Sequence, residues 1–214
     1  MLILLPLIGY VLGSLPTGLI YVRLFTGQDL RAVGSGRTGG TNAMRAAGLG
    51  VGLLTAFSDV FKGTLAVWLA QWALPAETRA LGMVLAGLAA ILGHNYSIFL
   101  RFKGGAGGAT ATGAAMAMWP WMLLIVVPLG GGILYFIGYA SVATLAAAAA
   151  ITLAFALLAA LKLLDPLFIL YGVGALILLA WSLRPNLARL LRGEERLVGL
   201  RAKRQAAQVT PKSE

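Results

Sequence analysis

The sequence predicts an all-α integral membrane protein with seven transmembrane helices, its N-terminus outside and its C-terminus in the cytoplasm. Hydrophobic residues make up 59% of the 214 residues, charged residues only 11%, and the mean hydropathy is +0.87. A soluble domain carries about 25% charged residues, so this chain cannot cover itself with a water-compatible surface. Its apolar residues form long runs separated by short polar, glycine-rich breaks. We expect a membrane domain over residues 1–183 and a basic cytoplasmic tail over residues 184–214.

The first apolar run, residues 1–24, has no cationic residue before it and no small-residue cleavage site. It is expected to be a spanning helix rather than a removed signal peptide. A helix needs about 20 apolar residues to cross a bilayer. Further runs predict spanning helices at residues 51–74, 80–100 and 166–183.

The apolar stretch over residues 107–161 has room for either two long helices or three shorter ones. Three helices would be separated at Trp119-Pro120 and at Gly138-Tyr139, because proline removes an N–H and glycine tolerates a turn. Two helices would be separated at the glycines of residues 130–132.

The distribution of basic residues favours the three-helix alternative, which makes seven spans in total. One face then receives the basic residues of two polar loops and of the tail: Arg31, Arg37, Arg45, Arg101, Lys103, Arg184, Arg189, Arg192, Arg196, Arg201, Lys203, Arg204 and Lys212. The opposite face receives only Arg79 and Lys162. Six spans would put the tail opposite the first two basic loops, against the positive-inside rule.

Three glycine-rich breaks, residues 34–45, 93–110 and 138–141, contain most of the polar residues before the tail. Glycine, Arg, Lys, Ser, Thr and Asn are the residue types of a phosphate site. The first break, GSGRTGGTNAMR, is either an anion cradle with Arg45 opposite a phosphate or a flexible loop whose arginines only set the topology. All three breaks fall on the cytoplasmic side of the seven-helix arrangement, so they can meet there.

The second break contains KGGAGGAT, a glycine-rich turn that starts at Lys103 and leads into a helix. This arrangement can bind an anion at a helix N-terminus, but it lacks the G-x-x-x-x-G-K-[ST] order of a nucleotide-binding loop. The alternative is a wide turn from which Arg101 and Lys103 reach the lipid headgroups.

Several isolated polar residues lie within the apolar runs. His94 is either a buried packing residue or a ligand for a phosphate or hydroxyl group. Asp59 and Lys62, at positions i and i+3 of a helix, predict a helix-surface ion pair, with a proton or ion path as the alternative. Ser141 has no nearby Asp/His pair, so a serine-hydrolase triad is not expected.

The composition excludes other classes of function. The chain has no cysteine and a single histidine, so disulfides, thiol catalysis and a zinc site are not expected. Its formal net charge of +10 follows the membrane rule and fits anionic headgroups rather than nucleic acid.

The motifs GSLPTGLIYVRLFTGQDLRAVGSG (13–36), GHNYSIFLRFKGG (93–105), GYAS (138–141) and RPNLARLLRGEE (184–195) resemble the bacterial acyl-phosphate:glycerol-3-phosphate acyltransferase family, the PlsY type. The resemblance runs over nearly the whole chain. It implies a multi-pass enzyme of the cell inner membrane that transfers a fatty acyl group from acyl phosphate to the 1-hydroxyl of glycerol 3-phosphate. The products would be lysophosphatidic acid and inorganic phosphate, in the first step of phospholipid synthesis.

The same resemblance implies no metal, nucleotide or coenzyme, and a soluble acyltransferase that generates acyl phosphate as a candidate partner. It assigns catalytic positions to Ser35, Arg45, Lys103, Ser141 and Asn186. It assigns substrate-binding positions to Thr41, Asn42, His94, Gly104, Gly105 and Gly107. The first loop with Arg45 would hold one phosphate, and Lys103 with its glycine turn would hold the other.

Three positions depart from the family pattern. Arg37 stands where the family usually has asparagine, Ala106 replaces a second lysine of the glycine turn, and Leu183 replaces a histidine near the C-terminus. Arg37, Arg101 and Arg184 are candidates to compensate, although arginine and lysine are not interchangeable. The alternatives to an active enzyme are a weak or inactive paralogue that binds acyl or glycerol phosphate and, more remotely, a small-solute transporter.

Overall fold

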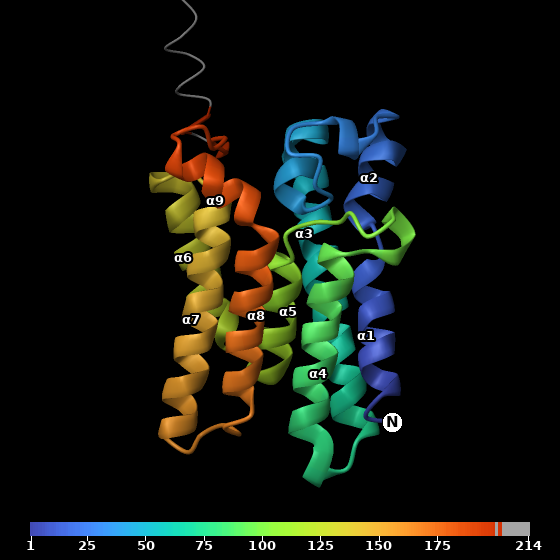
Figure 1. Ribbon diagram of the computed structural model, residues 1–214, viewed down its shortest axis with the longest axis vertical. Coiled ribbons are helices and arrows are strands. Elements are labelled where there is room, and N and C mark those ends of the chain that lie inside the picture. The colour runs from blue at the N-terminus through green and yellow to red at the C-terminus, as the bar shows by residue number, and fades with distance from the viewer. Residues whose placement is uncertain (200, 203–214) are drawn as a thin grey trace, which may run out of the picture.

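The computed structural model describes residues 1–199, 201 and 202, and the regular elements of this part are all helices. The all-α prediction is therefore confirmed. The helices pack side by side along one axis (Figure 1). In chain order they are α1 (Leu4–Ser14), α2 (Thr17–Thr26), η1 (Leu30–Ala32), α3 (Gly40–Ala73), α4 (Ala76–Asn95), η2 (Ile98–Leu100), α5 (Gly108–Met118), α6 (Met122–Phe136), α7 (Ala140–Ala160), α8 (Phe168–Ser182) and α9 (Arg184–Leu191).

Four segments are long and apolar enough to cross a membrane: Leu4–Thr26, Gly40–Ala73, Ala76–Leu100 and Ala140–Ala160. A fifth is α8 with α9, if this pair, bent by 63°, counts as one span. α6 is apolar but has only 15 residues, and α5 has 11. A multi-pass membrane protein is thus supported, while the count of seven spans and the orientation stay predictions.

The region over residues 107–161 forms three helices, α5, α6 and α7. They are separated near Trp119-Pro120 and Gly138-Tyr139, as the three-helix alternative predicts. The glycines of residues 130–132 lie inside α6, so the two-helix alternative is wrong for this region.

α3 begins at Gly40, well before the helix start predicted at residue 51. Its first turns hold polar residues of the first glycine-rich break, which the hydropathy pattern does not recognise as helix. Gly48 interrupts α3 with φ 84° and ψ 175°, a backbone conformation that is essentially restricted to glycine. The turns before Gly48 therefore form a separate short helical piece that carries Thr41, Asn42 and Arg45.

Small residues bring the central helices into close contact. A Cβ atom at Gly13 of α1 would overlap the backbone of Ala90 in α4, and one at Gly113 of α5 would overlap the backbone of Val60 in α3. Such close backbone approach is typical of membrane helix interfaces. It fixes α4 and α5, which carry the two ends of the second glycine-rich break, against α1 and α3.

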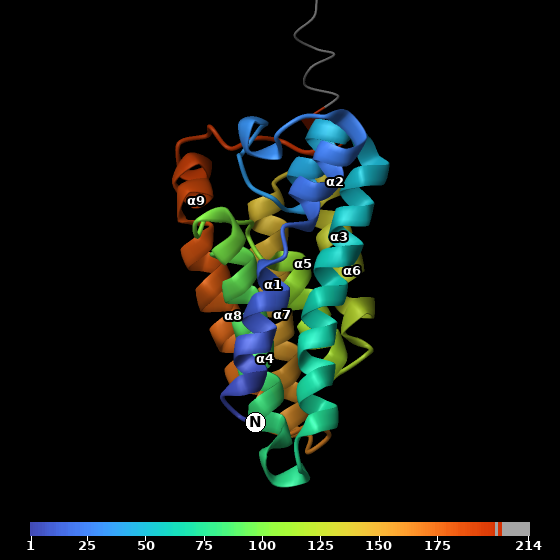
Figure 2. The same cartoon turned by 90° about the vertical axis from the view of Figure 1, so that its right-hand side faces the viewer.

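The α2–α3 segment, the α4–α5 segment, the α6–α7 junction and α9 all lie at one end of the bundle, the upper end in Figures 1 and 2. The chain after α9 returns to the α6–α7 junction, where the Val198 N–H donates to the Gly138 carbonyl at 2.9 Å. The three glycine-rich breaks therefore meet, as the sequence predicts.

Candidate functional site

A cavity of about 170 Å³ opens where the three breaks meet. It is bounded by the α2–α3 segment, the start of α3, the end of α4, the glycine turn, the start of α7 and α9. Eight of the predicted site residues line it: Ser35, Thr41, Asn42, Arg45, His94, Gly107, Ser141 and Asn186.

Asn42 organises the first wall of this cavity. Its Nδ2 lies 3.2 Å from the Leu30 carbonyl oxygen and 2.9 Å from those of Val33 and Arg37. Its Oδ1 accepts the Ser35 N–H at 3.1 Å. Because its side chain forms hydrogen bonds with the loop backbone, Asn42 fixes the conformation of the first break and positions Ser35 at the cavity.

Arg45 extends from the short helical piece before Gly48 and lines the same cavity. Its side chain is half-buried. Among the described residues it forms no ion pair with a carboxylate. Its positive charge is therefore available to an anion in the cavity.

The glycine turn is held against the end of α4. The Gly104 and Gly105 N–H groups donate to the carbonyls of Asn95 and His94, at 3.1 and 2.9 Å. A Cβ atom at Gly105 would overlap the His94 imidazole, so this position accepts only glycine without a shift. His94 is thus the support on which the turn rests.

Not every residue of the glycine turn lines the first cavity. Gly104 and Gly105 line a second, more open cavity of about 310 Å³ between the ends of α4 and α8. The Lys103 side chain is exposed and lines neither cavity. The structure therefore brings Arg45 into the first cavity and leaves Lys103 on the outer side of the turn.

Asp59 and Lys62 form a buried ion pair, so the prediction of a helix-surface pair is wrong. They are 1% and 5% exposed. The Lys62 Nζ lies 2.8 Å from Asp59 Oδ1, which also accepts the Thr17 hydroxyl at 2.9 Å. His94 Nδ1 is 3.6 Å from the same oxygen. These partners replace water at Oδ1, as a buried carboxylate requires, whereas the buried Oδ2 has no hydrogen-bond partner in the described part of the chain.

Ser141 and Asn186 contribute buried polar atoms to the opposite wall. The Ser141 Oγ and the Asn186 Oδ1 have no hydrogen-bond partner in the described part of the chain. The Asn186 Nδ2 donates to Glu195 Oε1 at 2.7 Å, and Arg189 Nε donates to Glu195 Oε2 at 3.1 Å. A buried polar atom without a partner costs free energy, so a ligand that supplies one would be stabilised here.

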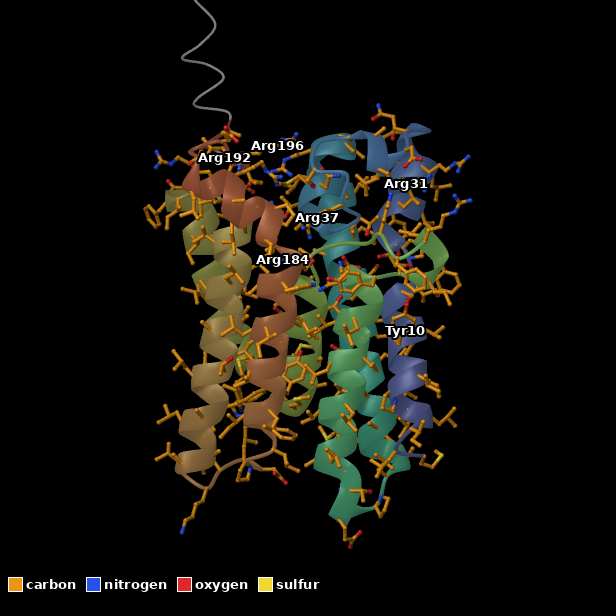
Figure 3. All side chains as sticks on the ribbon, in the orientation of Figure 1. Tyr10, Arg31, Arg37, Arg184, Arg192 and Arg196 are labelled. Atoms are coloured by element: carbon orange, nitrogen blue, oxygen red, sulfur yellow. The ribbon has the colours of Figure 1, made fainter. Side chains whose placement is uncertain are left out.

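The three departures from the family pattern, Arg37, Ala106 and Leu183, also line the first cavity. Of the other candidate compensating cations, Arg184 lines the second cavity and Arg101 lines neither. Figure 3 shows Arg37, Arg184 and Arg196 at this end of the bundle.

Sequence reasoning missed several cavity residues, namely Asp59, Arg189, Glu195 and Arg196. Glu195 follows Glu194, and this pair of acids within a basic tail was the available signal. The described part of the tail folds back to line the cavity, while the boundary at residue 183 stays a prediction. The tail residues Lys203, Arg204 and Lys212 lie outside the described part.

The charge balance of the first cavity favours an anionic ligand. Its lining includes Arg37, Arg45, Arg189 and Arg196, together with the carboxylates of Asp59 and Glu195. Both carboxylates are paired, with Lys62 and Arg189 respectively. Within residues 1–199, 201 and 202, no group of three or more His, Asp or Glu side chains could hold a metal ion. Fixed guanidinium groups, hydroxyls and backbone N–H groups are well suited to phosphate.

Known proteins resemble this chain over nearly its full length. The sequence model described as glycerol-3-phosphate acyltransferase matches residues 3–193. The glycerol-3-phosphate acyltransferase of Thermus thermophilus is 41% identical over 202 residues, which cover 92% of this chain and 94% of the relative. That of Staphylococcus saprophyticus is 34% identical over 201 residues, which cover 91% and 96%.

Two crystal structures of PlsY (YgiH), an integral membrane glycerol 3-phosphate acyltransferase, have the same fold. The glycerol 3-phosphate form superposes with a TM-score of 0.80 at 31% identity, covering 98% of this chain and 99% of that one. The lysophosphatidic acid form gives 0.77 at 30% identity, covering 92% and 95%. On the family match and on these relatives, the protein belongs to the glycerol-3-phosphate acyltransferase family.

Proposed function

We propose that the protein transfers a fatty acyl group from acyl phosphate to the 1-hydroxyl of glycerol 3-phosphate, giving lysophosphatidic acid and inorganic phosphate. The observation that carries this proposal is the cavity in which all three glycine-rich breaks meet around Arg37, Arg45 and Arg196, which form no ion pair with a carboxylate of the described residues. Family membership and the glycerol 3-phosphate bound by the PlsY neighbour support the acceptor. The acyl phosphate donor is our inference from the motif resemblance.

The reaction requires little covalent chemistry from the protein itself. Acyl phosphate is an activated mixed anhydride, so the glycerol hydroxyl attacks its carbonyl carbon and the bond to the phosphate oxygen breaks. The leaving phosphate can take the hydroxyl proton, which balances the step without a protein base. What remains is to bring two anions together and to stabilise the charge that develops. The reaction needs no metal, nucleotide or coenzyme.

The arrangement of the walls suggests a role for each residue. Arg45, with Ser35 and Thr41 from the wall shaped by Asn42, would hold the phosphate of glycerol 3-phosphate. The partnerless atoms of Ser141 and Asn186 would bond substrate oxygens. His94 would support the turn formed by Gly104, Gly105 and Gly107. Lys103 would meet the second phosphate from the outer side of this turn, where its exposed side chain lies.

The proposed setting is the cell membrane, crossed seven times, with the cavity facing the cytoplasm. α5 and α6 are short for spans, but helices whose ends are buried in protein can be shorter than a full crossing. A cytoplasmic cavity would receive glycerol 3-phosphate from solution and acyl phosphate made by a soluble acyltransferase.

The proposal is tested with purified protein reconstituted in phospholipid vesicles and labelled glycerol 3-phosphate. Long-chain acyl phosphate, acyl-coenzyme A and an acylated carrier protein are supplied separately, and labelled lysophosphatidic acid is measured. We expect product only with acyl phosphate. Product with acyl-coenzyme A alone would overturn the proposed donor while leaving the acceptor in place.

A second candidate is a weak or inactive paralogue that binds a phosphate substrate without transferring the acyl group. The observation that favours it is the position of Ala106 and Leu183 on the cavity wall, where the family pattern has a lysine and a histidine. Thermal stabilisation by acyl phosphate or glycerol 3-phosphate without any product would identify this case.

A further inference from the structure

Arg37 ties the first glycine-rich break to two distant parts of the chain. Its Nη1 donates to the Gly105 carbonyl at 3.2 Å and to the Ser182 hydroxyl at 3.1 Å. Its Nη2 donates to the Ser182 carbonyl. The Ser182 hydroxyl also lies 3.4 Å from the Gly105 carbonyl oxygen. These contacts hold the guanidinium between the glycine turn and the end of α8.

These bonds use only one part of the guanidinium. Arginine has five N–H donors in a planar fork. The Arg37 Nη1 has two of the acceptors just described. Along the Nε/Nη2 edge, the Nε–H has no partner within residues 1–199, 201 and 202, and the Nη2 has one acceptor for its two hydrogens. This edge is a ready pair of parallel donors.

Arg31, in the same polar segment, shows what such an edge binds. Its Nε and Nη2 both contact the carboxylate of Asp29, with Nε to Oδ1 at 3.0 Å and Nη2 to Oδ2 at 2.6 Å. Arg37 has no such carboxylate, because all three of its acceptors are neutral. A bidentate oxyanion such as phosphate matches the geometry that remains.

Burial makes this unpaired charge costly. Arg37 is half-buried, and this burial together with nearby Arg189 lowers the pKa of its guanidinium below the ordinary value, with Glu195 acting in the opposite direction. Arginine nevertheless stays protonated in proteins. A buried charge without a counterion is unfavourable, so an anion that joins Arg37 would be stabilised by its charge and by two hydrogen bonds.

Arg37 also lies where two substrates could meet. It lines both the 170 Å³ cavity that holds Arg45 and the second cavity between α4 and α8, and it is the one residue these two linings share. The second cavity is bordered by Trp181, whose apolar side chain is 55% exposed. A lipid chain that packs against Trp181 would place its phosphate at Arg37.

We propose that Arg37 binds the phosphate group of the acyl donor through the free Nε/Nη2 edge of its guanidinium, while Arg45 holds glycerol 3-phosphate. This inference rests on the proposed function. Ala106 and Leu183 carry no charge on the adjoining wall, and the nearby Arg189 is already paired with Glu195, so Arg37 is the cation near these two positions that an anion can still join.

The test is steady-state kinetics of Arg37→Gln and Arg37→Lys with each substrate varied in turn. We expect Arg37→Gln to raise the KM for acyl phosphate about tenfold or more, the effect of losing one charge-assisted contact. The KM for glycerol 3-phosphate should change by less than about threefold. Arg37→Lys should be intermediate, because lysine keeps the charge but lacks the fork.

Two matched variants separate ligand binding from a structural role. Ser182→Ala removes one acceptor of the tie but leaves the free edge of Arg37 intact, so the KM for acyl phosphate should stay within about twofold. Arg31→Gln removes an exposed arginine of the same segment whose edge Asp29 already occupies, and its kinetics should match the unmodified protein. If Ser182→Ala reproduces the effect of Arg37→Gln, or if Arg37→Gln lowers only kcat, Arg37 is a structural tie and the proposal fails.

A binding measurement keeps this test independent of turnover. A non-hydrolysable acyl phosphonate in vesicles should raise the thermal unfolding temperature of the unmodified protein and not that of Arg37→Gln. Inorganic phosphate, tested in parallel, distinguishes binding of the phosphate alone from binding of the amphiphile. If the protein makes no lysophosphatidic acid but this Arg37-dependent stabilisation persists, the proposed function fails and the site stands. Equal stabilisation of both proteins overturns the site.

Discussion

Arg45 and Lys103 have similar sequence contexts, since each lies near glycines and hydroxyl residues. The fold nevertheless places the two side chains in different surroundings. Arg45 is half-buried and lines the first cavity, whereas Lys103 is exposed on the outer side of the glycine turn. A charge-assisted hydrogen bond is worth about 1.5–3 kcal/mol, and it contributes most where water is excluded. Placement relative to the cavity should therefore decide how strongly each cation holds a phosphate.

We expect Arg45→Ala to raise the KM for glycerol 3-phosphate about tenfold or more, and Lys103→Ala to raise it less. Removing Arg45 deletes a contact inside the cavity, whereas Lys103 must bring its Nζ inward from an exposed position to make one. Kinetics in vesicles with saturating acyl phosphate measure both effects. Arg192→Ala is the control, because Arg192 is exposed and pairs with Glu194 outside the cavity. An unchanged KM in Arg45→Ala would remove Arg45 from the proposed phosphate site.

Positions 106 and 183 allow the two candidate functions to be separated. Both line the first cavity, so a lysine or a histidine introduced there would face the proposed substrates. If a missing cation and imidazole limit this protein, Ala106→Lys combined with Leu183→His should raise the acyl-transfer rate about tenfold or more, the effect of one contact regained in the transition state. If the unmodified protein turns over briskly and the double variant is no faster, an arginine has replaced the missing cation. Arg37 is the cation placed to do so.

At the scale of helices, the break at Gly48 decides where Arg45 points. The φ of 84° at Gly48 separates the short piece that carries Arg45 from the rest of α3. A Cβ atom at this position would meet no neighbour within 4 Å, so the requirement for glycine comes from the backbone alone. The hydropathy pattern shows the apolar body of α3 but cannot show this break, because it depends on one residue's dihedral angles.

Gly48→Ala should therefore lower the stability by roughly 1–3 kcal/mol, the range for a residue held in a disallowed backbone region, and should impair transfer by misplacing Arg45. Gly50→Ala is the matched control. Gly50 lies two residues further along α3, with no positive φ and no neighbour within 4 Å of an added Cβ, so alanine should stabilise the helix by roughly 0.5–1 kcal/mol. Thermal unfolding in detergent and the transfer assay compare them. Equal stability of the two variants would show that the break is not required.

The elements that the sequence predicts well are those that depend on composition and spacing. Breaks near residues 119 and 138 follow from proline and glycine within apolar runs, and both are present. The buried Asp59–Lys62 pair was predicted to lie on a surface, because an i, i+3 spacing does not reveal which neighbouring helix will cover it. Glu195 was missed for a similar reason, since its partners Asn186 and Arg189 are defined only once the chain after α9 turns back.

At the scale of the whole molecule, the polar breaks gather at one end of the bundle. This arrangement predicts an enzyme whose active site opens on one side of the membrane only. The exposed positions Gln28, Arg101 and Glu194 lie in segments at the end of the bundle that holds the cavity. Glu77 and Lys162 are exposed at the start of α4 and in the α7–α8 connection, at the opposite end. The positive-inside rule assigns the first end, with its excess of Arg and Lys, to the cytoplasm.

Single-cysteine labelling tests this arrangement directly, because the chain has no cysteine of its own. In intact cells, a membrane-impermeant maleimide should label Glu77→Cys and Lys162→Cys but not Gln28→Cys, Arg101→Cys or Glu194→Cys. The last three should react only after the membrane is permeabilised, and retained acyl transfer by each variant provides the folding control. Labelling of Glu194→Cys together with protection of Lys162→Cys would invert the orientation. Labelling of Gln28→Cys together with protection of Glu194→Cys would mean an odd number of spans between them, as six spans in total would give.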